Sequence, residues 1–187
     1  MKILYLSGRG GELHSGLGKH LQSLASEFGG IGFNDATLSH SFGEQVGAVK
    51  ELITHYACRD TYLIANSYGC YVLLHALIGA PSLPSKTLML SPLLGRVHLR
   101  SEGFSSRPPR LRALNQALAQ HTIQKPAYLS MVAGDQDPIC EPAELRDVAD
   151  LLGADHCELL QHQGHMIEHD VMDTVLSEFF AKQQTTL

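Results

Sequence analysis

Residues 61–79, with the sequence TYLIANSYGCYVLLHALIG, constrain the fold of this chain more than any other stretch. The stretch opens with an apolar run at 62–65, which is typical of a buried parallel strand, and it continues from Cys70 as an apolar helix. Between the two lies the turn Asn66-Ser67-Tyr68-Gly69. A serine at a sharp strand-to-helix turn has its hydroxyl raised clear of the sheet, and the first free N–H groups of the helix face the same space. We therefore expect Ser67 to be presented for chemistry.

Small residues stand on both sides of this serine, Ala65 before it and Gly69 after it. We expect strand and helix to approach so closely there that a larger side chain would clash. Two simpler interpretations compete with a catalytic one. Ser67 would cap the helix of an ordinary α/β protein, or the uncharged stretch 61–85 would span a membrane. Asn66 and other polar residues within that stretch fit a strand, turn and helix better than a span.

Length and composition bound the remaining possibilities. A chain of 187 residues without a break in composition is expected to form one domain over 1–187. Its net charge of −5 argues against general binding to nucleic acid or anionic membranes. The four cysteines are widely spaced without a CxxC pair, which favours buried thiols over a disulfide framework. The N-terminal apolar run is too short for a signal peptide, so we expect a soluble cytoplasmic protein whose oligomeric state stays open.

The rest of the chain alternates apolar strands with helices. Strands are predicted at 2–6, near 33–38, and at 62–65, 86–92, 127–134 and 157–160; helices are predicted at 15–28, 42–57, 70–78, 110–121, 142–152 and 167–183. This alternation predicts an α/β fold with a mostly parallel sheet of about six strands and helices on both faces. Ligands bind beyond the carboxyl ends of such strands. The turn at Ser67 and the loops after the first and last two strands all lie at that edge.

A serine nucleophile needs a carboxylate to orient its base, and the loop after 127–134 offers two. This loop reads Gly134-Asp-Gln-Asp-Pro-Ile, so Asp135 and Asp137 compete. We favour Asp137 because it comes three residues after the glycine, where the chain has cleared the strand. A solvated aspartate turn is the simpler interpretation of the same residues.

The base is expected in the loop after the last strand, where residues 161–170 contain three histidines. His162 lies at the strand end and His169 within the following helix. We favour His165, because the loop after Gly164 leaves it free to point toward the serine. His165 and His169 have the i,i+4 spacing of some metal ligands, but no third ligand stands out and an HExxH motif is absent. We therefore expect no metal, and His169 as a capping or surface residue.

The order Ser67, Asp137, His165, together with the strand-to-helix turn and the Gly164-His165 dipeptide, resembles the α/β-hydrolase superfamily over nearly the whole chain. The resemblance is to its small single-domain serine esterases. It implies an α/β-hydrolase fold and a serine hydrolase, of carboxylesterase or thioesterase type. Such an enzyme cleaves a small acyl ester or thioester with a Ser-His-Asp triad through an acyl-enzyme and needs no cofactor.

The resemblance also implies an oxyanion hole formed by the backbone N–H groups of Arg9 and Tyr68. The family often has His-Gly in the loop after the first strand, where this chain has Ser7-Gly8. Because backbone amides and not an imidazole bind the oxyanion, we expect this departure to leave the hole intact. The nearby glycines allow the backbone to approach a substrate closely.

The glycines near the N-terminus also suggest nucleotide binding. However, the run from Gly8 to Leu13 lacks the third glycine of GxGxxG. The segment that ends in Gly18-Lys19-His20 lacks two positions of the P-loop, since Leu13 replaces its first glycine and His20 its Ser/Thr. We expect no nucleotide cofactor.

The connection at about 93–126 is rich in arginine: Arg96, Arg100, Arg107, Arg110 and Arg112 lie within it. The resemblance implies that this connection covers the active site as a short lid, in which case the arginines would favour an acidic substrate or partner. The simpler interpretation is a solvated helix face at 110–121.

A function of another class stays open at this point. Fold does not guarantee chemistry, so the chain could be a non-catalytic hydrolase-fold module that binds a protein partner. The sequence leaves the acyl length, the leaving group and the choice between ester and thioester undecided.

Overall fold

The computed structural model describes residues 1–95 and 108–182. Within these residues six strands form one sheet, in which every neighbouring pair is parallel and the order is β2-β1-β3-β4-β5-β6. The strands are β1 (Lys2–Arg9), β2 (Glu27–Phe33), β3 (Thr61–Asn66), β4 (Lys86–Leu90), β5 (Tyr128–Gly134) and β6 (His156–Leu160). The helices are α1 (Gly16–Leu24), α2 (Asp35–Leu38), α3 (Phe42–Tyr56), α4 (Tyr68–Leu77), α5 (Leu111–Ala119), α6 (Pro142–Leu152) and α7 (His169–Ala181).

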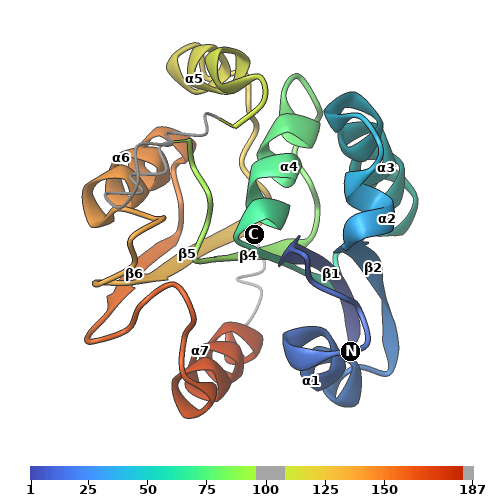
Figure 1. Ribbon diagram of the computed structural model, residues 1–187, viewed down its shortest axis with the longest axis vertical. Helices are drawn as coiled ribbons and strands as arrows, with labels where there is room; N and C mark the ends of the chain where they lie inside the picture. Colours follow the sequence, from blue (N-terminus) through green and yellow to red (C-terminus); the bar gives the residue numbers. More distant parts are fainter. Residues whose placement is uncertain (96–107, 183–187) are drawn as a thin grey trace.

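Helices cover both faces of the sheet, as predicted (Figure 1). Helices α1 and α7 lie on one face, and α3, α4, α5 and α6 lie on the other. Strand β1 shows why the sheet strands are apolar throughout. Its Leu4 and Leu6 pack into the core on the α4 side, while Ile3 and Tyr5 pack into a second core under α1 and α7. A strand buried on both faces reads as a continuous apolar run.

The prediction of a helix at 15–28 is wrong after residue 24. Helix α1 ends at Leu24, and the residues from Glu27 to Phe33 pair with β1 as a strand. Gly30, which follows the predicted helix, lies inside this strand. A Cβ at Gly30 would lie 1.9 Å from the carbonyl oxygen of Tyr5, so the glycine permits a close approach of two strands.

The weaker strand predicted near 33–38 is also wrong. Strand β2 ends at Phe33, and Asn34 caps α2 by accepting a hydrogen bond from the N–H of Thr37 at 3.1 Å. The other predicted elements are present with boundaries shifted by a few residues. The best match is α6, which has Pro142 at its first turn and the left-handed Gly153 as its C-cap.

The strand order brings two loops to one crevice. The chain runs from β1 outward to β2 and then returns to the other side of β1 as β3. Connections therefore leave the carboxyl ends of β1 and β3 in opposite directions, and such a point is where ligands bind in open α/β sheets. Ser67 follows β3 directly, and Gly10 follows β1.

Helix α4, the apolar helix of the 61–79 stretch, is buried along its whole length. A helix that is buried on every side in the protein core is apolar on every side, so its composition does not require a membrane. Within the two described ranges, no helix combines the length and hydropathy that a bilayer span requires.

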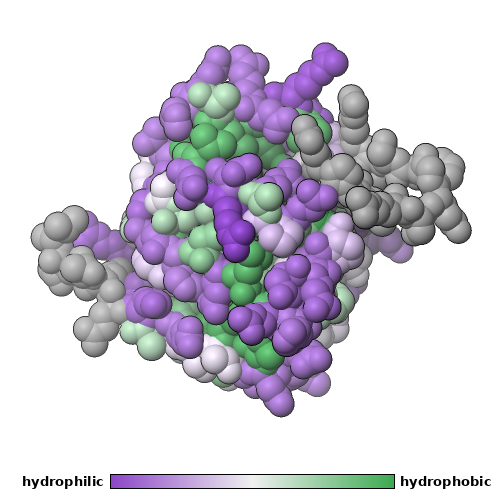
Figure 2. Space-filling view, turned by 90° about the vertical axis from the view of Figure 1, so that its left-hand side faces the viewer, coloured by the Kyte–Doolittle hydropathy of each residue, from purple (hydrophilic) through white to green (hydrophobic). Residues whose placement is uncertain are grey.

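The flank bearing α6 and β6 is mainly hydrophilic, with narrow apolar strips between the polar groups (Figure 2).

The arginine-rich connection is described only in part. Arg96, Arg100 and Arg107 lie outside the described residues, so the expected lid stays a prediction. Helix α5 presents Arg112 to solvent and buries Leu114 and Leu118, as the simpler interpretation expects. The guanidinium of Arg110 lies 6.0 Å from the ring centroid of Phe42.

The four cysteines are free, as expected. Cys70 and Cys140 are buried, whereas Cys58 and Cys157 are exposed, so burial holds for two of the four.

Candidate active site

Ser67 has a strained backbone that its surroundings hold in place. Its φ of 48° and ψ of −110° are unusual for a residue with a side chain. Its N–H donates to the carbonyl of Leu90 at 2.9 Å, and its own carbonyl accepts from the N–H groups of Cys70 and Leu93, both at 3.1 Å. These three backbone hydrogen bonds connect the turn to β4, to the first turn of α4 and to the segment after β4.

Gly69 allows α4 to start close to the sheet, although its closest neighbours differ from the expected ones. A Cβ at Gly69 would lie 2.5 Å from the carbonyl oxygen of Leu6 and 2.6 Å from that of Ser7. Both oxygens belong to β1, whereas we expected the close approach to be with the preceding strand. Ala65 is fully buried, and its carbonyl accepts a hydrogen bond from the thiol of Cys70 at 3.1 Å.

The structure brings together three of the predicted site residues. The Oγ atom of Ser67 lies 2.9 Å from Nε2 of His165, and Nδ1 of His165 lies 2.9 Å from Oδ2 and 3.1 Å from Oδ1 of Asp137. When Nδ1 carries the proton that is donated to the carboxylate, Nε2 is free to accept the proton of the serine hydroxyl. This geometry can support transfer of the serine proton to the imidazole.

Asp137 is held as a buried carboxylate. Its side chain has no exposed area, and Oδ1 accepts hydrogen bonds from the N–H groups of Ile139 at 2.8 Å and Cys140 at 3.0 Å. Burial would raise the pKa of Asp137, but hydrogen bonds from His165 and these two amides outweigh it and hold the pKa below its ordinary value. The competing Asp135 is exposed.

The loops that carry Asp137 and His165 touch through their backbones. A Cβ at Gly134 would lie 2.1 Å from the carbonyl oxygen of Gln163. That oxygen accepts a hydrogen bond from the N–H of Gln136 at 2.9 Å, and Oε1 of Gln163 accepts one from the N–H of Glu168 at 2.8 Å. Gln163 is therefore a buried positioning residue that the sequence interpretation missed. His162, which precedes Gln163 and was the alternative base, is exposed.

The loop after β1 lies against the serine. The hydroxyl of Ser7 donates to the carbonyls of Gly8 and Gly11 and accepts from the N–H of Phe33 at 2.8 Å, so this serine fastens the loop. A Cβ at Gly8 would lie 3.5 Å from Cβ of Ser67. This loop thus reaches the serine without the histidine that the family often has there.

Arg9 and Tyr68, the predicted oxyanion residues, are neighbours at this edge. The guanidinium of Arg9 lies 5.9 Å from the ring centroid of Tyr68. The hydroxyl of Tyr68 donates to Oε1 of Gln45 at 2.9 Å, and its ring packs edge-on against Phe33 at 5.3 Å. Strand β1 continues to Arg9 after a register shift that begins beyond Leu6, and such irregularities re-aim the backbone beside active sites. The role of the two amides stays a prediction.

A cavity of about 280 Å³ opens beside His165. Apolar side chains form part of its wall: Leu17, Met166, Ile167 and Met172. Ser91 also lines it; the Oγ of Ser91 is buried and has no hydrogen-bond partner within residues 1–95 and 108–182. The sequence gives no sign of this serine, because its position in the wall depends on how β4 ends. His20, His169 and Asp173 lie in the same wall.

Comparison with known proteins is consistent with this geometry. A family model described as "Serine hydrolase" matches residues 40–174. The "Putative hydrolase YdeN" of Bacillus subtilis (strain 168) is 28% identical over 143 residues, which cover 71% of this chain and 70% of that protein.

Solved structures share the fold at lower identity. The ydeN gene product from B. subtilis is 17% identical, with a TM-score of 0.67 over 97% of this chain and 100% of that one. A monoacylglycerol lipase from Paleococcus ferrophilus is 13% identical, with a TM-score of 0.67 over 97% and 94%. SOBER1 from Arabidopsis thaliana is 14% identical, with a TM-score of 0.61 over 96% and 97%. These likenesses confirm the predicted α/β-hydrolase fold.

Proposed function

This chain belongs to the serine hydrolase family, and from that premise we propose that it cleaves a carboxylic ester or thioester by attack of Ser67. One observation carries the proposal: a continuous series of contacts from the serine hydroxyl through His165 to the buried Asp137, with 2.9 Å at each step. A nucleophile, a base and a group that orients the base are the parts that acyl transfer by serine requires.

In the first step Oγ of Ser67 attacks the substrate carbonyl carbon while Nε2 of His165 takes the hydroxyl proton. The carbonyl π electrons move onto oxygen to form the tetrahedral oxyanion. When the oxyanion collapses, the bond to the leaving group breaks, and the leaving group takes the proton from His165. The acyl group then remains on Ser67 as an ester.

Asp137 and the backbone amides have separate roles in this proposal. The carboxylate of Asp137 keeps the imidazole in the tautomer that can accept a proton at Nε2, and it stabilises the imidazolium that forms. The N–H groups of Arg9 and Tyr68 stabilise the developing oxyanion, and each such donor contributes about 10²–10³ in rate. Support comes from the loop after β1, which lies against Ser67 at Gly8.

The second step repeats the first with water as the nucleophile. His165 removes a proton from water, the hydroxyl attacks the acyl carbon, and Ser67 leaves with the proton that His165 returns. We place the acyl chain in the cavity beside His165, because Leu17, Met166 and Met172 give its wall an apolar surface.

Labelling with a fluorophosphonate probe tests the nucleophile. We expect the wild-type chain to react and the Ser67→Ala variant to be inert, and we expect hydrolysis of short p-nitrophenyl esters to disappear with the label. Ser39→Ala is the matched control, because Ser39 is exposed and its hydroxyl donates to the carbonyl of Ala36. A wild-type protein that is folded, resists the probe and turns over no ester or thioester would overturn the proposal. That outcome would favour the alternative of a non-catalytic interaction module.

A further inference from the structure

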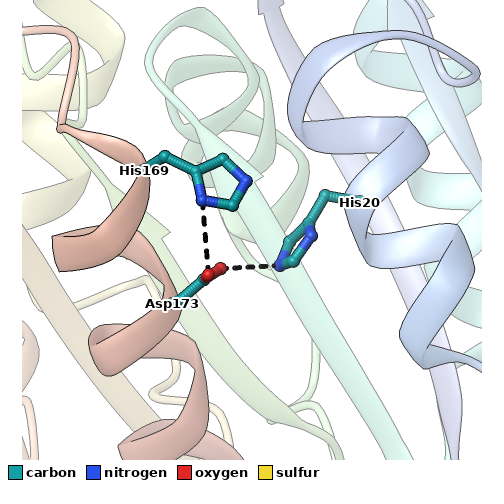
Figure 3. A group of neighbouring side chains, drawn as sticks. All are labelled: His20, His169 and Asp173. Carbon is teal, nitrogen blue, oxygen red and sulfur yellow. Dashed lines mark ion pairs between the residues drawn. The ribbon is translucent and has the colours of Figure 1, made fainter.

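A second group of side chains with metal-ligand chemistry lies in the wall of the same cavity. His20 comes from α1, and His169 and Asp173 come from α7 (Figure 3). Nε2 of His20 lies 2.9 Å from Oδ1 of Asp173, and Nδ1 of His169 lies 3.3 Å from Oδ2 of the same carboxylate. The rings of His20 and His169 meet edge to face, with centroids 5.3 Å apart.

The packing of α1 and α7 brings these residues together. Both helices cover the same face of the sheet (Figure 1). Leu21, next to His20, is buried in the same core as Val175 and Leu176 of α7, so both helices are held by apolar packing. His169 and Asp173 are four residues apart and therefore lie on one side of α7. The three side chains are thus carried by two helices that share one apolar core.

In the part of the chain that the structure describes, hydrogen bonding leaves one oxygen of this group unsatisfied. Oδ1 of Asp173 is buried and has no hydrogen-bond partner among the described residues, although Nε2 of His20 lies 2.9 Å away. The imidazole therefore approaches the carboxylate without directing an N–H at it. A buried carboxylate oxygen without a hydrogen bond is costly. A cation shared by this oxygen and the ring nitrogens would remove that cost.

The geometry and the donor atoms point to the kind of ion. We propose that His20, His169 and Asp173 bind a divalent transition-metal ion, with Zn²⁺ as the reference case. Their ligand atoms all lie within 4.8 Å of one another. Zn²⁺ binds imidazole nitrogen at about 2.0–2.1 Å in tetrahedral geometry, which separates neighbouring ligand atoms by about 3.3 Å. The distances from the carboxylate of Asp173 to the two ring nitrogens, 2.9 and 3.3 Å, are close to that separation.

Two imidazoles and one carboxylate select against the hard cations. Mg²⁺ and Ca²⁺ prefer oxygen ligands, whereas imidazole suits zinc, copper, iron and nickel. Three protein ligands leave a coordination position for water. The side chain of His169 is 74% exposed and that of Asp173 is 44% exposed, so an ion can reach the site from solvent.

This site differs from the pair considered in the sequence. There His169 was matched with His165, and no third ligand was apparent. In the structure His165 contacts Ser67 and Asp137. His169 instead contacts His20 of α1 and Asp173, one turn further along α7. The metal site does not depend on the proposed role of Ser67.

Calorimetric titration of the full chain with Zn²⁺ tests the proposal, with Co²⁺ absorption in the visible range as a second readout. We expect one ion per chain and a rise in melting temperature. Loss of a residue that only supports a metal ligand lowers metal affinity about 10–100-fold. His20→Ala and Asp173→Asn remove direct ligands, so we expect each to weaken Zn²⁺ binding at least about 100-fold. Asp173→Asn nearly preserves the side-chain shape, and the melting temperature of each variant in EDTA shows whether it folds.

His55→Ala is the matched control. His55 is exposed, lies on α3 at the other face of the sheet and contacts the carbonyl of Glu51. This variant and Ser67→Ala are expected to bind Zn²⁺ like the wild type, which separates the metal site from the proposed catalysis. Absence of stoichiometric binding would overturn the proposal. So would binding that His20→Ala and Asp173→Asn leave unchanged, or equal binding of Ca²⁺.

Discussion

Gly134→Ala is the substitution that tests most directly how the loops of the site are held together. A Cβ at this position would lie 2.1 Å from the carbonyl oxygen of Gln163, whereas real Cβ atoms essentially never approach closer than 3.0 Å. The loop after β6 must therefore move away from residue 134 by about 0.9 Å, the difference between these two distances. Backbone atoms form this contact, so no rotation of a side chain can relieve it.

This displacement of the loop would lengthen the distance between His165 and Asp137. If the whole displacement reached His165, its distance of 2.9 Å to Oδ2 of Asp137 would open to about 3.8 Å, beyond hydrogen-bonding range. A misplacement of about 1 Å can lower the rate about 10²-fold. Overpacking of this kind costs about 1–3 kcal/mol of stability, which a protein of ordinary stability survives.

The assay is kcat/KM for a short p-nitrophenyl ester, with a thermal melt of each variant. We expect Gly134→Ala to fold with a lower melting temperature and to lose about 10² in kcat/KM. Gly47→Ala is the matched control, because a Cβ at this position in α3 would have no described atom within 4 Å. A folded Gly134→Ala variant with the activity of the wild type would refute the reasoning that this contact positions His165.

Three further predictions follow from buried polar groups. Asp137→Asn is expected to lower kcat about 10⁴-fold with little change in KM, because an amide stabilises the wrong tautomer of His165. Steady-state ester kinetics measure both constants, and only a small loss of kcat would contradict the prediction. Ser91→Ala removes a buried hydroxyl that no described residue hydrogen-bonds. Urea unfolding is therefore expected to show unchanged stability or a gain of about 1 kcal/mol, not a loss. Burial lowers the pKa of His75 below 6.5, so the folded chain binds fewer protons there than the unfolded chain. The contribution of neutral His75 to stability is therefore complete above pH 6.5 and is lost as the pH falls through the folded-state pKa. Over that range the His75→Gln variant is expected to lose less stability than the wild type, which melting curves at several pH values measure.

Local patterns were enough to predict the strand, turn and helix around Ser67. The same patterns failed at Gly30, since a glycine can end a helix or let two strands approach, and only the pairing partner decides between them. That partner is Tyr5, 25 residues earlier in the chain, which a local pattern cannot identify. Pairing over such distances is where tertiary contacts override local propensity.

The candidate site shows the same division between topology and packing. Ser67, Asp137 and His165 could be chosen from the sequence because each follows a strand of one parallel sheet, and the carboxyl ends of those strands meet at one edge. The residues that fix their geometry could not be chosen. Gln163 acts through a backbone contact between two loops, and a sequence does not show which glycine leaves room for which carbonyl.

Packing also explains why the group of His20, His169 and Asp173 was not predicted from the sequence, whereas the contacts of Ser67, Asp137 and His165 were. His20 and Asp173 are separated by most of the chain and lie on helices that meet only because both bury apolar residues against one face of the sheet. Helices have several faces, and the rotation of each is set by packing that no short motif records. The carboxyl edge of a parallel sheet, in contrast, follows from the strand order alone. A chemical site built at that edge is therefore easier to predict from a sequence than one built between two helices, even when the residues of the second lie in the wall of the same cavity.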